Sequence, residues 1–498
     1  MDILTGFATL FSDPVTLGFV VLAAFTGVIV GAIPGLTSAA AIAMLVPATF
    51  FMQPLPALAF LYVIGKSGRF GGSISAILFN TPGTAAAAAT QIDGHPMYRA
   101  GKAGKAMKTA ATASMFGDFL GDLLLIFAAV WIASFTEGLG PPELFAVYLT
   151  AFIVISSVVG SSIIKGLIST AAGIIIATIG TDPISATARL DFGILNFQSG
   201  MSLVPLLIGM FVLSEIALQL EQSKGGSGSI VLRESDKSDN TFTFAELRRC
   251  LPVMMRSSVI GAVIGILPGL GSSVAAFASY GEAKRRAKNR EEWGTGIVEG
   301  IAAPESANNA VSGPTMIPLL ALGVPGSTIA AILMGVFLIH GIPIGPQIFI
   351  TSRELVFGLF AAGLLGIGIY GLIGFFGSSF IGRMIAKVPT RLIYPYIFLT
   401  CFVSAYAART SVFDVFIMCV AGLLGYLMRK NGYSTAAFII AFVLARGAEE
   451  TLRQSLILTN DGALIFLQRP IALLFFAFGA LVVAARLWQK YRSRTRTA

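Results

Sequence analysis

The chain has 498 residues, of which 55% are hydrophobic and only 12% are charged, and its formal net charge is +9. Soluble domains carry about 25% charged residues, so a chain with half that share would expose too much apolar surface to remain in water. The basic excess does not indicate a nucleic-acid partner, because Lys and Arg cluster in short loops between apolar segments, as in chains oriented in a membrane.

Apolar segments recur along the chain and are long enough to cross a bilayer, which takes roughly 20 residues. They lack the alternating pattern of barrel strands. Clear examples are residues 17–33, 144–159, 201–220, 357–380 and 472–485. The sequence therefore predicts an all-α polytopic membrane protein, with about 12 to 15 membrane segments of the length that a bilayer requires.

The amino-terminal span is predicted to be retained, with the N-terminus outside. A secretory signal peptide begins with a basic region, whereas the first basic residue here is Lys66, and Asp2 and Asp13 lie near the start. The basic residues after residue 487 predict a cytoplasmic C-terminus. An outside start and an inside end require an odd number of crossings.

Two parts of the chain repeat the same motifs in the same order. The segment GVIVGAIPGLTS at 27–38 has the Gly, Pro-Gly-Leu and Ser spacing of GAVIGILPGLGS at 261–272. The pairs NTPGT at 80–84 and GVPGS at 323–327, and GHP at 94–96 and GIP at 341–343, follow. We infer an internal duplication, with a first membrane repeat at 1–220, a cytoplasmic linker at 221–249, and a second repeat plus a C-terminal helix at 250–498.

Loop charge predicts that the two repeats have opposite orientations. Residues 48–58 contain no Lys or Arg, whereas the corresponding segment at 284–290 contains five. The bias reverses after the second Pro-Gly, because 99–108 contains four basic residues and 340–354 only Arg353. The positive-inside rule then places equivalent loops on opposite sides. This predicts an inverted-topology repeat with discontinuous helices and possible re-entrant hairpins, which is typical of secondary transporters.

Pro-Gly pairs inside apolar segments are expected to interrupt helices. A single pair is more often a structural kink, but matching interruptions in two halves indicate the binding site of a transporter, because the freed backbone groups need partners. The predicted helix breaks are Pro34, Gly35, Pro82, Gly83, Pro268, Gly269, Pro325 and Gly326.

Polar residues near these breaks are the candidates for binding a substrate. A charge at membrane depth costs about 3 kcal/mol or more and is a functional candidate by default. Lys66 and Arg69 would suit a carboxylate; alternatively, their side chains extend to a membrane interface. The substrate-binding candidates are Lys66, Arg69, Ser73, Asn80, Thr81, Thr84, Ser327 and Thr328.

A second group of residues has the chemistry to couple a cation. Glu305 and Asn309 offer oxygen ligands for Na⁺, or Glu305 carries a proton. Asp118 and Asp122 share one helix face, where adjacent carboxylates would bind a proton or cation; a structural pairing, or placement near the helix end, is the alternative. The cation-coupling candidates are Glu305, Asn308, Asn309, Asp118 and Asp122. Na⁺ is the one possible metal ion, and no other cofactor is expected.

No enzymatic motif is found. His95 and His340 belong to no metal-binding pattern, and Lys66 does not end a phosphate-binding loop, because Phe60 stands where that loop needs glycine. Cys250, Cys401 and Cys419 have no metal-ligand spacing and are interpreted as small core residues. Glu215 is expected at an interface, and Asp182 is expected to cap a turn before Pro183.

Six motifs together resemble the large membrane subunit of the tripartite tricarboxylate transporter family, over nearly the whole chain. They are GAIPGL at 31–36, GGSISAILFNTPGT at 71–84, DGHP at 93–96, GILPGLG at 265–271, APESANNA at 303–310 and LGVPG at 322–326. Lys66, Arg69 and His95 depart from the family pattern, which leaves the substrate open.

The resemblance implies a permease of the bacterial cytoplasmic membrane that imports citrate or other carboxylates with Na⁺ or H⁺ coupling. It also implies two partners, a small membrane subunit and a periplasmic solute-binding protein. The alternatives are a stand-alone ion-coupled anion transporter and, less favoured by the duplicated breaks, a channel-type membrane protein.

Overall fold

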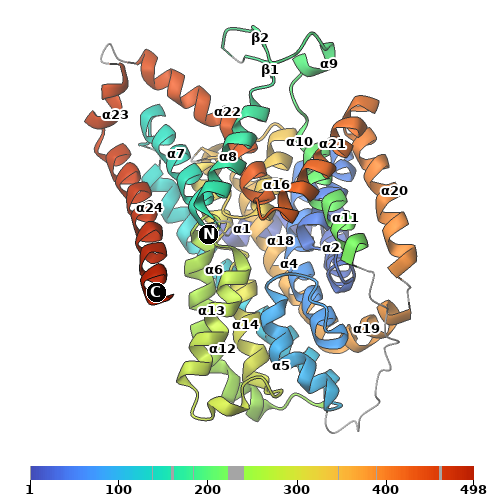
Figure 1. Cartoon of the computed structure of the whole chain (residues 1–498). Helices are drawn as coiled ribbons and strands as arrows, with labels where there is room; N and C mark the ends of the chain where they lie inside the picture. The colour runs from blue at the N-terminus through green and yellow to red at the C-terminus, as the bar shows by residue number, and fades with distance from the viewer. Residues whose placement is uncertain are drawn as a thin grey trace.

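The computed structural model describes residues 2–136, 138–158, 162–182, 184–222, 240–345, 347–387, 390–458 and 462–497. Within these residues the regular structure is almost entirely helical (Figure 1). The described strands are β1 (Gly180–Thr181) and β2 (Ala188–Arg189), which pair antiparallel with Gly180 opposite Arg189. The predicted all-α polytopic class is confirmed.

The helices before the linker are α1 (Asp2–Ser12), α2 (Pro14–Ala32), α3 (Ser38–Leu45), the 3₁₀ helix η1 (Val46–Phe51), α4 (Pro54–Phe79), α5 (Ala87–Arg99), α6 (Ala103–Thr136), α7 (Pro141–Val158), α8 (Ile163–Ala177), α9 (Leu195–Gln198), α10 (Leu203–Leu207), the π-helix η2 (Ile208–Leu213) and α11 (Ser214–Gln222).

The helices after the linker are α12 (Phe244–Ile266), α13 (Gly271–Arg286), η4 (Arg290–Glu292), α14 (Val298–Ala310), α15 (Met316–Leu322), α16 (Thr328–Ile339), α17 (Ile348–Thr351), α18 (Arg353–Leu372), the π-helix η5 (Ile373–Gly377), α19 (Ser378–Lys387), α20 (Thr390–Arg409), α21 (Val412–Lys430), α22 (Thr435–Ile457), η6 (Gly462–Leu464), α23 (Ile465–Gln468) and α24 (Pro470–Thr497).

Six helices in the described part of the chain are long and apolar enough to cross a membrane, or seven if the bent pair at 462–486 is one span. Five shorter apolar helices of 10–17 residues accompany them, including α3 and α16 beside the helix breaks. The lower bound of the 12 to 15 segments expected from the sequence is reached when the bent pair and all five short helices are counted as membrane segments.

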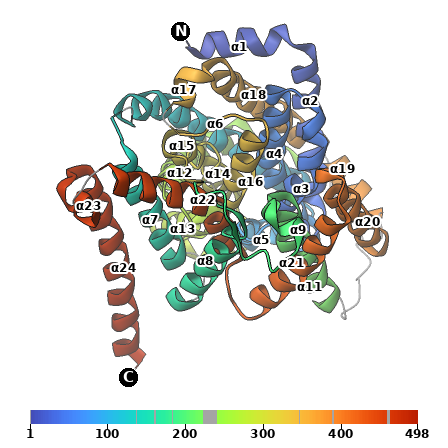
Figure 2. The same cartoon turned by 90° about the horizontal axis from the view of Figure 1, so that it is seen from above.

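The two halves of the sequence are not separate bodies. Helix α18, from the second half, packs on α1, α2, α4 and α6, and α6 packs on α14 and α12. The last residues of the predicted linker are helical, because α12 begins at Phe244, where Thr243 and Glu246 form a capping box. Residues 223–239 of the linker lie outside the described residues. Helix α24 packs on α7 at the periphery, as Figure 2 shows.

Equivalent helix pairs in the two halves make the same close contact. A methyl group on Gly27 would lie 2.8 Å from the carbonyl oxygen of Ile64, and one on Gly261 would lie 2.3 Å from the carbonyl oxygen of Ala307. Both distances leave no room for a side chain, so glycine allows α2 to approach α4, and α12 to approach α14. The sequence separation between Ile64 and Ala307 equals that between Pro82 and Pro325. One offset therefore relates equivalent positions of α4 and α14, and we call this the common register of the two halves.

The two basic loops, at 99–108 and 284–290, lie at the same end of the bundle, the lower end in Figure 1. Asp93 of α5 accepts hydrogen bonds from the backbone amides of Gly294, Gly296 and Ile297 in the loop after α13. Lys105 pairs with Glu246 at 2.7 Å. The β1–β2 hairpin is at the opposite end. This common placement is what the loop-charge analysis requires; the inverted repeat and the side that faces the cytoplasm remain predictions.

Candidate functional site

A cavity of about 470 Å³ lies where the four helix interruptions meet. The first interruption separates α2 from α3, the second α4 from α5, the third α12 from α13, and the fourth α15 from α16. The cavity residues from these interruptions and the adjacent turns are Thr37, Ser38, Ala39, Thr84, Ala85, Gly269, Gly271, Ser272, Ser273, Gly326, Ser327 and Thr328. We refer to this cavity as the central pocket.

Equivalent interruptions have equivalent backbones. Gly35 and Gly269 follow their prolines with φ of 83° and 86°, a left-handed conformation that glycine adopts without steric cost. Asn80 ends α4 with φ of 57°, and Gly323 ends α15 with φ of 70°. The duplicated Pro-Gly motifs therefore produce the same turns twice, and these turns bring the following helices to the central pocket.

Five helices begin at the central pocket, namely α3, α5, α13, α16 and α22. Three of them, α3, α16 and α22, are capped by the hydroxyls of Thr37, Ser327 and Ser434, which accept from backbone amides at 3.2, 3.2 and 3.0 Å. Because the N-terminus of a helix carries partial positive charge and unsatisfied N–H groups, five such ends around one cavity favour an anion.

The charged residues in the lining of the central pocket are two arginines and one glutamate. Arg69 is 6% exposed, and its Nη1 donates to the carbonyl oxygen of Asn308 at 3.1 Å. Arg429 of α21 pairs with Glu215 at 2.5 Å. Glu215 is buried beside Arg429, and its expected place at a membrane interface stays a prediction. Arg69 therefore brings a positive charge that no carboxylate lining the central pocket balances.

Lys66 lies outside the central pocket, between α4, α6 and α18. Its Nζ is 2.6 Å from Asp118 Oδ1 and 2.8 Å from Asp122 Oδ1, and all three side chains are at most 1% exposed. Tyr370 donates to Asp118, and Tyr62 donates to Asp122, each at 3.1 Å. The Lys66 side chain therefore does not extend to a membrane interface. Asp118 and Asp122 are paired through its ammonium group, which is the structural pairing that the sequence analysis gave as an alternative to cation binding.

Glu305 is fully buried in a cradle of hydroxyl groups. It accepts hydrogen bonds from Ser73 at 2.5 Å, from Ser114 at 2.7 Å and from Thr90. Asn309 donates to Ser114 Oγ at 2.9 Å, but its Oδ1 has no partner among the described residues. Neither polar atom of the Asn308 side chain, 1% exposed, has a described partner. These unpaired acceptors beside a buried carboxylate can hold a small cation or water.

The chain matches the model of the Tripartite tricarboxylate transporter TctA family over residues 17–440. The chain belongs to this family. It is 34% identical over 494 residues to the Agrobacterium vitis "Uncharacterized 52.8 kDa protein in TAR-I ttuC' 3'region", covering 98% of this chain and 96% of that protein. A second Agrobacterium vitis relative, "Uncharacterized protein in TAR-II ttuC' 3'region", is 34% identical over 236 residues, which are 47% of this chain and 96% of the relative. No solved structure matches.

Membership in the TctA family makes this chain the large subunit of a tripartite tricarboxylate transporter. Among the substrate-binding candidates, this TctA-family protein has Arg69, Thr84, Ser327 and Thr328 at the central pocket. Lys66 and Ser73 are bound to carboxylates elsewhere. Asn80 and Thr81 are exposed, and Asn80 accepts a hydrogen bond from Gln91.

Other residues of the central pocket were not identified from the sequence. Thr37, Ser38 and Ser272 follow the Pro-Gly-Leu motifs closely, so proximity to the motif was an available signal. Arg429 and Thr435 come from α21 and from the start of α22, far from any motif, and no local pattern indicates them.

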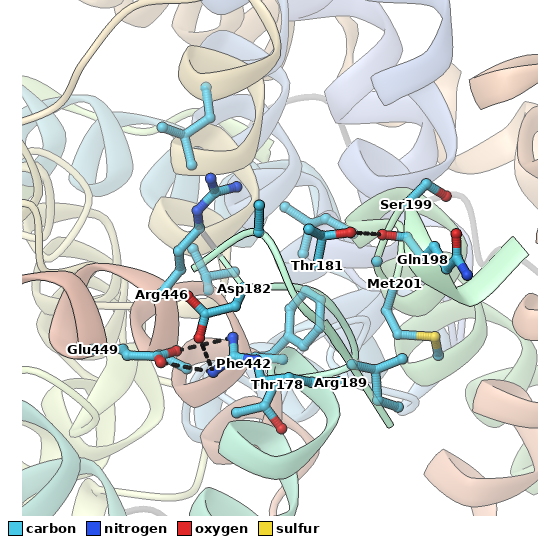
Figure 3. Close-up of a pocket in the computed structure, with 18 residues that line it drawn as sticks. Thr178, Thr181, Asp182, Arg189, Gln198, Ser199, Met201, Phe442, Arg446 and Glu449 are labelled. Carbon is cyan, nitrogen blue, oxygen red and sulfur yellow. Dashed lines mark hydrogen bonds and ion pairs between the residues drawn. The ribbon is translucent and has the colours of Figure 1, made fainter. Parts of the chain in front are cut away.

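A second polar pocket, of about 610 Å³, lies beside the β1–β2 hairpin (Figure 3). Arg189 pairs with Glu449 at 2.7 Å, and Arg453 pairs with Asp182 at 2.8 Å. Asp182 Oδ1 accepts from the backbone amides of residues 184 and 185, as the predicted turn cap would; residue 183 lies outside the described part of the chain. These hydrogen bonds lower the pKa of Asp182. Since these charges pair with each other, the central pocket is the better candidate for an anion.

Proposed function

We propose that this chain is the permease subunit of a binding-protein-dependent secondary transporter that imports tricarboxylates or related organic carboxylates across the bacterial inner membrane. The observation that carries the proposal is the convergence of five helix N-termini and Arg69 on the central pocket. A pocket of several hundred cubic ångströms is ordinary for a small ligand. Its hydroxyl and N–H groups can donate hydrogen bonds to carboxylate oxygens.

Substrate recognition would combine a strong cation with weaker dipoles. The guanidinium of Arg69 presents several N–H donors in a plane, which suits a carboxylate. Arg429 is held by Glu215 at 2.5 Å, so it would contribute less free charge than Arg69. A tricarboxylate would place one carboxylate at Arg69 and the others at the capped helix ends. The four interruptions are contributed by both halves of the sequence, as alternating access around a fixed midplane site requires.

Coupling to Na⁺ or H⁺ would follow from the charges buried beside the central pocket. Three carboxylates, Asp118, Asp122 and Glu305, stand near two cations, Lys66 and Arg69, and all five side chains are at most 6% exposed. A buried charge without a partner costs several kcal/mol, so one further cation would neutralise the cluster. Glu305 is the carboxylate without a described ion-pair partner, which makes its surroundings the proposed coupling site.

The partners would be a small membrane subunit and a periplasmic solute-binding protein. Support for them comes from the tripartite family to which the chain belongs. The N-terminus would be outside and the C-terminus cytoplasmic, with the basic loops at 99–108 and 284–290 inside, following the positive-inside rule.

The test is uptake of a labelled tricarboxylate panel into proteoliposomes. The full chain would be reconstituted with its small subunit and binding protein, then with each omitted, under separate Na⁺ and H⁺ gradients. We expect uptake that needs both partners and one gradient. Uptake that persists without a gradient would contradict coupling and favour a channel, and uptake without the binding protein would favour a stand-alone transporter.

Two variants locate the coupling cation. Glu305→Gln removes the buried charge but keeps the shape, and Asn309→Ala removes the unpaired oxygen. Because Glu305→Gln removes the charge proposed to hold the cation, we expect gradient-driven uptake to fall at least tenfold, equivalent to roughly 1.4 kcal/mol. Substrate exchange without a gradient should continue. Both variants retaining full gradient stimulation would move the coupling site elsewhere and leave the carboxylate pocket intact.

A further inference from the structure

The site that holds Lys66 has the composition of a cation site. Two carboxylates, Asp118 and Asp122, approach its Nζ at 2.6 and 2.8 Å, and the Tyr62 hydroxyl donates to Asp122. Lys66 itself is completely buried. The second oxygen of Asp122, 1% exposed, has no hydrogen-bond partner among the described residues. The site therefore offers more acceptor capacity than one ammonium group uses.

The common register of the two halves gives Lys66 a counterpart. The interval between Pro82 and Pro325 pairs Lys66 with Asn309. Both side chains bind α6, because Lys66 contacts Asp118 and Asn309 donates to Ser114, one helical turn away.

The same register relates the residues one turn earlier in each helix. It pairs Tyr62 with Glu305. Tyr62 lies four residues before Lys66, and Glu305 lies four residues before Asn309. One half thus presents a neutral phenol and a fixed ammonium to α6, and the other presents a carboxylate and an amide. Of the two equivalent positions, 66 therefore has a cationic side chain and 309 has a neutral one.

We propose that the Lys66 ammonium replaces a small monovalent cation in a site formed by Asp118 and Asp122, which leaves one free coupling cation for the Glu305 site. The coupling part rests on the proposed function, whereas occupancy of the Asp118–Asp122 site by a cation does not. Hard monovalent cations such as Na⁺ bind oxygen ligands, and two carboxylates one helical turn apart need a cation or a proton to be buried together.

The test measures cation binding without transport. The purified full chain in detergent would be unfolded by heat at increasing NaCl, with choline chloride keeping the ionic strength constant. We expect Lys66→Ala to show a saturable rise of its unfolding midpoint with Na⁺, larger than any rise in the wild type, because a ligand that binds only the folded state stabilises it. The triple variant Lys66→Ala, Asp118→Asn, Asp122→Asn should lose this additional rise.

A matched control breaks another ion pair that has a buried carboxylate. Arg409 pairs with Asp414 at 2.6 Å, and Asp414 is 1% exposed, but among the described residues Arg409 has this one carboxylate partner. Arg409→Ala should show no additional Na⁺ dependence. Lys66→Asn, which copies the equivalent Asn309, serves as a second variant if the alanine variant does not fold.

Two outcomes overturn the proposal. One is a folded Lys66→Ala or Lys66→Asn protein whose midpoint depends on Na⁺ no more than that of the wild type. The other is the failure of both variants to fold even in molar NaCl, since Na⁺ should then substitute for the ammonium. In proteoliposomes, the Hill coefficient of uptake for the coupling cation should rise from about 1 to about 2 in Lys66→Asn. Failure of uptake in the wild type would count against the proposed function alone.

Discussion

Replacing Arg69 with methionine tests the central pocket most directly. Arg69 lines that pocket, is 6% exposed and donates to the carbonyl oxygen of Asn308 at 3.1 Å. A hydrogen bond to a charged group contributes about 1.5–3 kcal/mol. Since 1.4 kcal/mol is a factor of ten, the variant should bind a tricarboxylate roughly 10- to 150-fold more weakly. Arg429 cannot compensate fully, because Glu215 holds it.

The same substitution has a cost in stability that must be separated from binding. The carbonyl oxygen of Asn308 would lose its donor, and an unsatisfied buried acceptor costs about 1–3 kcal/mol. Arg69→Lys keeps the charge but loses the planar set of donors, so it should recover part of the affinity. Arg453→Met, which removes the ion-pair partner of Asp182 beside the hairpin, is a matched control that should leave substrate affinity unchanged.

The assay has two parts, equilibrium binding of a labelled tricarboxylate to the purified protein and the concentration dependence of uptake in complete proteoliposomes. Thermal unfolding would establish that each variant is folded. A folded Arg69→Met protein with wild-type affinity would refute the assignment of Arg69 to the substrate, and with it the interpretation of the central pocket as an anion site.

Two further predictions concern the fold around the pockets. Gly83→Ala should lower the unfolding midpoint by the equivalent of about 1–3 kcal/mol, the usual cost of overpacking, because a methyl group would lie 2.5 Å from the carbonyl oxygen of Gly31; an unchanged midpoint would show that the second interruption is loosely packed. The lowered pKa of Asp182 means that its hydrogen bonds stabilise the turn above the ordinary aspartate pKa of about 3.9 and lose that effect as the pH falls through the folded pKa. Amide exchange at residues 184–189, corrected for intrinsic rates, should therefore accelerate on acidification in the wild type, and Asp182→Asn should lack that response.

Much of the architecture follows from local sequence. Long uncharged segments such as 17–33 exclude a soluble fold, and Pro-Gly pairs interrupt helices because proline lacks an N–H. Glycine also accepts a positive φ, as at Gly35 and Gly269. The structure has all four interruptions, with α2 ending at Ala32 and α12 at Ile266. The duplication is also visible in the sequence, because each copy needs glycine at the same close approach between helices.

What the sequence could not determine depends on contacts between distant segments. Lys66 and Arg69 are three residues apart and equally basic, yet one is bound by Asp118 and Asp122 of α6 and the other faces the central pocket. Arg429 joins the pocket from α21 without any motif, and Glu215 is buried because Arg429 is its partner. Local sequence determines where helices break, since that depends on neighbouring backbone atoms. Which buried charge remains free for a ligand was decided only by the tertiary structure, because charge pairing in a low-dielectric interior depends on which helices lie within a few ångströms.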